Sequence, residues 1–200
     1  MPLTRRSALI ASAAASLAVP RARAEDASRT SERALGKPDA KVVVQEFFSL
    51  TCTHCAHFSQ TTMGDVKAKL IDTGKIRYVF RDFPLDQVAL TAAQVARALP
   101  PERFEPFISA LFASQDRWAF ARGVNSTEEL WKMAALAGMS RQTFDSAVND
   151  TDLRNFILQE QDEGTKKYKV DSTPSFVVNG KTQAGALDFA AFEKLVSAAA

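Results

Sequence analysis

The stretch FFSLTCTHCAHF, residues 47–58, contains both cysteines and both histidines of the 200-residue chain. It follows an apolar, β-branched run at 42–44 and precedes a segment with helical character, so it lies where a strand passes into a helix. Two cysteines separated by two residues at such a junction are typical of a redox site. Cys52 and Cys55 are therefore the candidate reactive pair.

The position of each cysteine predicts its role. Free backbone N–H groups and the positive end of a helix dipole stabilise a thiolate at the helix start, where Cys52 is expected. His54 can add positive charge or a hydrogen bond. Cys55 lies one turn into the helix and should be less exposed, so we expect Cys52 to be the attacking and leaving sulfur and Cys55 the resolving one. A Cys52–Cys55 disulfide closes a very small loop, so stability is a poor explanation for the pair.

Metal and haem sites fit these residues less well. Cys52, His54, Cys55 and His57 lie within six residues, whereas structural zinc usually takes ligand pairs from separated segments. A c-type haem needs histidine directly after the second cysteine, where Ala56 stands. We therefore predict no metal and no cofactor, and interpret His57 as a polar residue on a helix face. A metal-binding or chaperone-like envelope protein with incidental cysteines is the less favoured alternative.

The first 24 residues are typical of an export signal. Arg5-Arg6 precede an apolar stretch at 7–19, and Ala22-Arg23-Ala24 forms an A-x-A cleavage site. The stretch is shorter than the roughly 20 residues of a membrane span, and the arginine pair fits either general or twin-arginine export. Loss of this segment removes four arginines and leaves 21 basic against 23 acidic residues, a net charge of −2. That balance does not favour nucleic acid or an anionic membrane as partner. Export would place the cysteines outside the cytosol, where a cysteine pair can cycle through a disulfide.

The rest of the chain alternates between strand and helix patterns. Residues 25–40 are interpreted as a polar lead-in, 41–49 and 76–83 as strands, and 53–72 as the helix between them, which makes a parallel βαβ unit. Five helical segments follow, at 87–98, 102–116, 127–137, 141–149 and 152–167. A strand at 175–179, a hairpin at Asn179-Gly180 and a helix at 188–199 close the chain. The sequence thus predicts an α/β domain of residues 41–85 and 168–200, interrupted by a helical insertion at 86–167.

Two further places are candidates for the site. Glu46 lies six residues before Cys52 in an apolar strand, where a buried carboxyl would have a raised pKa and could exchange a proton with Cys55; the alternative is an edge glutamate in contact with water. Thr173-Pro174 precedes the strand at 175–179. A cis bond there would form a tight turn that exposes backbone groups to an extended peptide, while an ordinary trans proline is the alternative.

Taken together, EFFS at 46–49, CTHC at 52–55, a long helical insertion and VDSTPSFVVNG at 170–180 resemble the DsbA family of thiol–disulfide oxidoreductases. The resemblance implies a thioredoxin fold with an inserted helical domain, residence in the periplasm and donation of a disulfide to newly exported, cysteine-containing proteins. It also implies that Pro174 is cis and lies against Cys52, that Glu46 is the buried acid, and that a DsbB-like membrane protein re-oxidises the pair.

The sequence departs from the family pattern between the cysteines. Thr53-His54 stands where the family usually has Pro-His, which restores a backbone N–H near the sulfur. Thr173 before the proline also occurs among reducing and isomerising relatives, so a reductase or isomerase that uses the same pair is the main alternative. Isomerases of this type resemble oligomers with an N-terminal assembly segment, and 25–40 is too short for one. The sequence therefore favours a monomeric oxidase.

Overall fold

The computed structural model describes residues 28–199, built around a five-stranded sheet of order β1-β3-β2-β4-β5. The parallel pair at its centre is β2 (Val42–Phe48) and β3 (Ile76–Asp82), as the βαβ prediction requires. The other three strands, β1 (Arg33–Leu35), β4 (Ser175–Val178) and β5 (Lys181–Ala184), each pair antiparallel with a neighbour. Asn179 and Gly180 both have positive φ, at 49° and 75°, as a tight β4–β5 hairpin requires.

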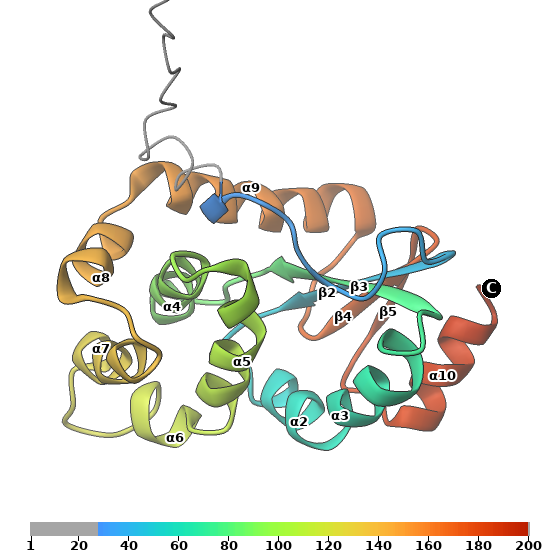
Figure 1. Ribbon diagram of the computed structural model, residues 1–200, viewed down its shortest axis with the longest axis horizontal. Coiled ribbons are helices and arrows are strands. Elements are labelled where there is room, and N and C mark those ends of the chain that lie inside the picture. Colours follow the sequence, from blue (N-terminus) through green and yellow to red (C-terminus); the bar gives the residue numbers. More distant parts are fainter. Residues whose placement is uncertain (1–27, 200) are drawn as a thin grey trace, which may run out of the picture.

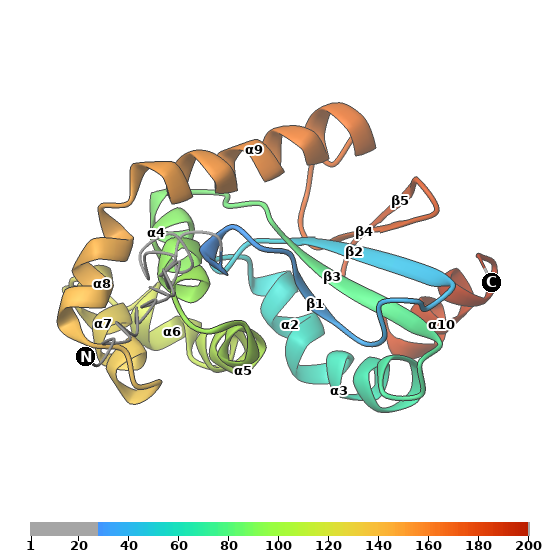
Figure 2. The same ribbon diagram turned by 45° about the horizontal axis from the view of Figure 1, so that its top comes forward.

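Helices cover both faces of this sheet (Figure 1). One face carries α2 (Thr53–Thr61), α3 (Met63–Val66), a π-helical turn at Lys67–Ile71 and α10 (Phe189–Ser197), and the other carries α9 (Thr151–Tyr168). Beside the sheet lie α4 (Gln87–Arg97), α5 (Pro101–Phe112), α6 (Gln115–Trp118), α7 (Ser126–Leu136) and α8 (Arg141–Val148) (Figure 2). Among residues 28–199, none of the helices is both long and apolar enough to cross a membrane.

The second half of strand β2, from Glu46 to Phe48, is buried on both faces, whereas Val43 is exposed and Gln45 is half-buried. Val44 and Phe48 face the main core with α2 and α10, while Phe47 belongs to a smaller cluster under α9. Helix α9 approaches Phe47 so closely that a Cβ on Gly164 would lie 2.6 Å from its ring. Glycine at this position therefore sets how tightly α9 packs on the sheet.

Three sequence-based predictions about the secondary structure need correction. The helix predicted at 102–116 is divided at Ala113-Ser114 into α5 and α6. Residues 33–35 are not part of a lead-in but form β1, because the buried Arg33 finds a hydrogen-bond acceptor in the Arg97 carbonyl at 2.9 Å. The helix predicted at 53–72 is divided at Thr62, whose φ of −120° is not helical and whose hydroxyl donates to the Leu187 carbonyl at 3.0 Å. The predicted export signal lies outside the described residues.

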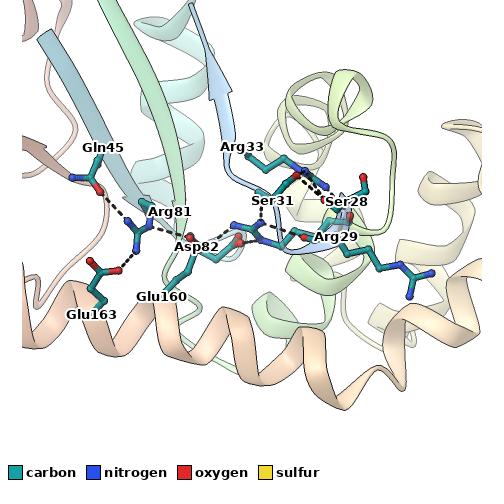
Figure 3. A network of polar contacts seen from close by, with 10 residues as sticks. Ser28, Arg29, Ser31, Arg33, Gln45, Arg81, Asp82, Glu160 and Glu163 are labelled. Atoms are coloured by element: carbon teal, nitrogen blue, oxygen red, sulfur yellow. Dashed lines mark hydrogen bonds and ion pairs between the residues drawn. The ribbon is translucent and has the colours of Figure 1, made fainter. Parts of the chain in front are cut away.

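A buried polar network joins the inserted helices to the sheet (Figure 3). Arg97 of α4 forms ion pairs with Asp82 at the end of β3 and with Glu160 of α9, the latter at 2.6 Å. Arg81 of β3 pairs with Glu160 at 3.0 Å and with Glu163 at 2.5 Å. Since a lone buried charge is costly, the network fixes α4 and α9 relative to β3.

Candidate active site

Cys52 is the residue that begins α2. Its backbone is extended (φ −79°, ψ 119°), its sulfur accepts the Cys55 N–H at 3.4 Å, and its carbonyl accepts the first helical hydrogen bond, from Ala56, at 3.1 Å. The sulfur therefore occupies the position that a serine hydroxyl takes at a helix N-cap. The strand–helix junction predicted from the sequence is where the structure places the pair.

The two cysteines differ in access to solvent. The structure shows both as free thiols, with Cys52 7% exposed and Cys55 0% exposed. A partner can therefore reach Cys52 first, and Cys55 only after Cys52 has reacted.

The surroundings move the two thiol pKa values in opposite directions. A hydrogen bond from the Cys55 thiol is the largest influence on Cys52; with Thr173 and the N–H groups of Cys55 and His54, and against partial burial, it lowers the pKa of Cys52 to about 5. Burial, followed by the hydrogen bond to Cys52 and the nearby charge of Glu46, raises the pKa of Cys55 well above its ordinary value. At neutral pH Cys52 is a thiolate and Cys55 a thiol.

Glu46 lies beneath this pair in the centre of the sheet. It is 5% exposed, and because β2 runs between β3 and β4 the residue is not on an edge. The Tyr78 hydroxyl donates a hydrogen bond to its carboxylate at 2.8 Å. Burial raises the pKa of Glu46 to about 7, the Tyr78 hydrogen bond acts against this rise, and the charge of Cys52 adds to it. Glu46 can therefore hold or release a proton near pH 7.

Thr173 and Pro174 reach the site from 121 residues away. The bond between them is cis, as the family resemblance implied, and Pro174 is buried. The Thr173 carbonyl oxygen lies 3.2 Å from the Cys52 sulfur and accepts a hydrogen bond from its thiol form. The Thr173 hydroxyl is buried without a hydrogen-bond partner among the described residues, so it is a donor available to the thiolate.

The side chains of both histidines lie on the surface of the protein. The side chain of His54 is exposed, and its contribution to Cys52 is its backbone N–H. His57 is exposed on α2, as its interpretation as a surface residue requires. Across residues 28–199, no group of three or more His, Cys, Asp or Glu side chains could hold a metal ion.

Sequence reasoning missed two polar residues at the site. Tyr78 alternates with charged residues in β3, a pattern that indicates only a half-buried strand, but its hydroxyl is the partner of Glu46. Gln115, at the start of α6, donates from its amide to the carbonyls of Leu50 and Cys52, at 2.7 and 3.1 Å. A glutamine in a polar helix start gives no sequence signal of such a contact.

Comparison with known proteins agrees with this geometry. The family model described as thioredoxin matches residues 28–198. A Rickettsia bellii protein, whose name assigns it to the protein-disulfide oxidoreductases, is 34% identical over 147 residues, which are 73% of this chain and 56% of that protein. A Rickettsia typhi protein of similar name is 35% identical over 147 residues, 73% of this chain and 54% of its own. The chain thus spans about half the length of the curated relatives it matches.

Solved structures show the same likeness over nearly their whole length. The crystal structure of Wolbachia pipientis alpha-DsbA1 has a TM-score of 0.77 and 29% identity, covering 84% of this chain and 90% of that one. A protein-disulfide isomerase from Novosphingobium aromaticivorans has a TM-score of 0.73 and 29% identity, covering 84% and 96%. The predicted thioredoxin fold with inserted helices is confirmed by these matches.

Proposed function

Because this chain belongs to the thioredoxin family, we propose that it is a thiol–disulfide oxidoreductase of the DsbA type, which exchanges a Cys52–Cys55 disulfide with cysteine pairs of other proteins. The observation that carries the proposal is the opposite displacement of the two pKa values. Cys52, at about 5, is a good leaving group, and the reduced pair is stabilised in consequence. A protein with a stabilised reduced form gives its disulfide away readily.

The exchange follows from the access and charge of the two sulfurs. A substrate thiolate attacks the Cys52 sulfur, the Cys52–Cys55 bond breaks, and a mixed disulfide forms while Cys55 takes the electron pair. A second substrate thiolate then attacks the substrate sulfur of that mixed disulfide, and Cys52 leaves as a thiolate. The substrate is oxidised by two electrons and the enzyme pair is reduced by two.

Glu46 is the proposed proton carrier of this exchange. When Cys55 leaves, it is buried and has a strongly raised pKa, so it needs a proton at once. Glu46 is close enough for its charge to act on Cys55, and its pKa of about 7 leaves it partly protonated at neutral pH. In re-oxidation the proton moves the other way.

The peptide that carries the substrate cysteine is proposed to bind along Thr173. The Thr173 carbonyl lies beside the Cys52 sulfur, so an extended chain there would bring its own cysteine to the reacting atom. Pro174 supports this segment from within the fold. His54, exposed next to Cys52, is proposed to contact the incoming thiolate.

We further propose the setting that the export signal and the family resemblance favour. The protein would be a periplasmic monomer, cleaved after Ala24, that oxidises newly exported proteins and is re-oxidised by a DsbB-like membrane partner. The alternative direction, reductase or isomerase, draws support from the likeness to the Novosphingobium aromaticivorans isomerase. The redox potential decides between the two directions.

The exchange itself is tested by trapping. The oxidised protein is mixed with a reduced peptide that contains two cysteines; we expect a peptide disulfide and a reduced Cys52–Cys55 pair. For trapping, Cys55→Ser is given a peptide whose single cysteine is held in a disulfide with glutathione. The Cys52 thiolate attacks the peptide sulfur, glutathione leaves as a thiolate, and the mixed disulfide on Cys52 should accumulate because Cys55 is absent and cannot resolve it. Cys52→Ser should form no such adduct. Absence of both peptide oxidation and trapping would refute the proposal.

A further inference from the structure

Two glutamine amides connect the inserted helices to the segment that carries the cysteines. Gln60 of α2 donates to the Phe112 carbonyl at the end of α5, at 3.0 Å. In the other direction, Gln115 of α6 donates to the carbonyls of Leu50 and Cys52. Both amides form hydrogen bonds between the inserted helices and the segment of residues 50–60, but only Gln115 bonds to the loop that carries the reactive sulfur.

Gln115 has a buried polar side chain, and both N–H donors of its amide form hydrogen bonds to this loop. Its side chain is packed away from solvent, as are Leu50 and Cys52. The Leu50 carbonyl receives its hydrogen bond from Gln115, and the Cys52 carbonyl receives one from Gln115 in addition to the helical one from Ala56. A buried carbonyl that loses its donor is energetically penalised, so the contact holds the loop in place.

The held carbonyl belongs to the peptide unit that leads into α2. The Cys52 carbonyl and the Thr53 N–H are two ends of one peptide dipole, and a donor at the oxygen end strengthens the N–H end through cooperative polarisation. The Thr53 N–H is one of the free N–H groups at the helix start. The same restraint keeps the N–H groups of His54 and Cys55 directed at the sulfur, where they favour the thiolate.

We propose that Gln115 is a positioning residue of the exchange site, through which the helical insertion sets the acidity of Cys52. The inference deepens the proposed function and rests on Cys52 being the reactive thiol. It assigns the insertion a part in the chemistry, because a residue of α6 controls how much of Cys52 is thiolate at a given pH. Gln115 itself touches backbone, not the reacting sulfur.

The test is a titration of the Cys52 thiolate by its absorbance near 240 nm in the reduced protein. Cys55 has a strongly raised pKa, so the low-pH transition reports Cys52 alone. Gln115→Met keeps the length of the side chain and removes both donors; we expect the Cys52 midpoint to rise by about one pH unit, a tenfold loss of thiolate below the midpoint. Gln115→Glu, which places a carboxylate against the same carbonyls, should raise it further.

Gln60→Met is the control. It removes an amide–carbonyl bond across the same boundary, made by an exposed side chain, and it should leave the Cys52 midpoint within about 0.3 units of the wild type. If Gln115→Met folds and shows no rise, the inference is wrong; if it does not fold, an unshifted midpoint in Gln115→Glu overturns it instead. Because the titration uses no substrate, it tests the role of Gln115 separately from the exchange reaction. An unshifted Cys52 midpoint refutes the role of Gln115 even if the protein oxidises the peptide, and a lack of peptide oxidation refutes the proposed function even if the midpoint shifts.

Discussion

The low pKa of Cys52 should make the stability of the reduced protein depend on pH. The structure lowers that pKa from an ordinary value of 9.0 to about 5. A group with a depressed pKa in the folded state contributes stability that is complete above the unfolded pKa and is lost as pH falls through the folded one. The contribution of Cys52 should therefore be absent near pH 4 and grow steadily up to about pH 9.

The size of this contribution at neutral pH follows from the two units between pH 5 and pH 7. At about 1.36 kcal/mol per unit, ionisation of Cys52 is worth at most about 2.7 kcal/mol at pH 7. The sulfur lies near the surface, and solvent screening reduces the expected figure to about 1.5–2.5 kcal/mol. Urea unfolding of the reduced wild type and of Cys52→Ser, from pH 4 to pH 8, measures it as a difference that widens with pH.

The same pKa places the protein on the redox scale. Thioredoxin combines a thiol pKa of about 7 with about −270 mV, and DsbA combines about 3.5 with about −120 mV. Linear interpolation to a pKa of about 5 gives a potential of about −185 mV. Equilibration with glutathione buffers tests this value. A Cys52 midpoint above pH 7, with a potential near −270 mV and a stability difference that does not change with pH, would refute the reasoning.

Four substitutions of residues other than the cysteines test three further parts of the structure by urea unfolding. Burial raises the pKa of Glu46 to about 7, so ionisation of Glu46 opposes folding at a pH above its pKa in the unfolded chain. Glu46→Gln should therefore raise the free energy of unfolding by about 2–3 kcal/mol at pH 8 and leave it unchanged at pH 4. Gly164→Ala should lower the free energy of unfolding by about 1–3 kcal/mol, because the added Cβ overpacks against Phe47. Gly64→Ala, where the Cβ would meet open space, should raise it by up to about 1 kcal/mol. Equal effects of the two substitutions would contradict the close packing of α9. Arg97→Leu leaves Asp82 buried without its ion pair and should lose about 3–5 kcal/mol at pH 7, and a loss below 1 kcal/mol would contradict the network.

Local patterns in the sequence predicted much of the fold. The parallel pair of strands, the hairpin at Asn179-Gly180 and the cysteine pair at a helix start each depend on neighbouring residues, and the structure contains all three. The departures depend on residues far apart. Strand β1 pairs with β3, and its Arg33 donates to the Arg97 carbonyl, 64 residues later; no periodicity within 25–40 indicates either contact.

The same distinction applies within the site. Cys52, Cys55 and Glu46 could be predicted because their chemistry is unusual for their place in the sequence. Tyr78 and Gln115 could not, since an aromatic residue in a strand and a glutamine on a helix are ordinary until the fold brings them to Glu46 and to the Cys52 carbonyl. Tyr78 and Gln115 are the hydrogen-bond partners that the buried Glu46 carboxylate and Cys52 carbonyl require. A sequence shows that such a buried polar group exists, but not which distant residue will bond to it.

The helical insertion is then more than a covering for the sheet. Its α4 and α9 are fixed to β3 through Arg97 and Glu160, and Gln115, the first residue of its α6, donates to the Cys52 carbonyl. The buried ion pairs of Arg97 connect the insertion to the sheet more rigidly than the single side chain of Gln115 does. A shift of the insertion relative to the sheet should therefore strain the hydrogen bond from Gln115 to the Cys52 carbonyl first. Because that contact holds the Cys52 carbonyl at the start of α2, where the N–H groups of His54 and Cys55 favour the thiolate, we expect any such shift to change the acidity of Cys52 before the fold itself is disturbed.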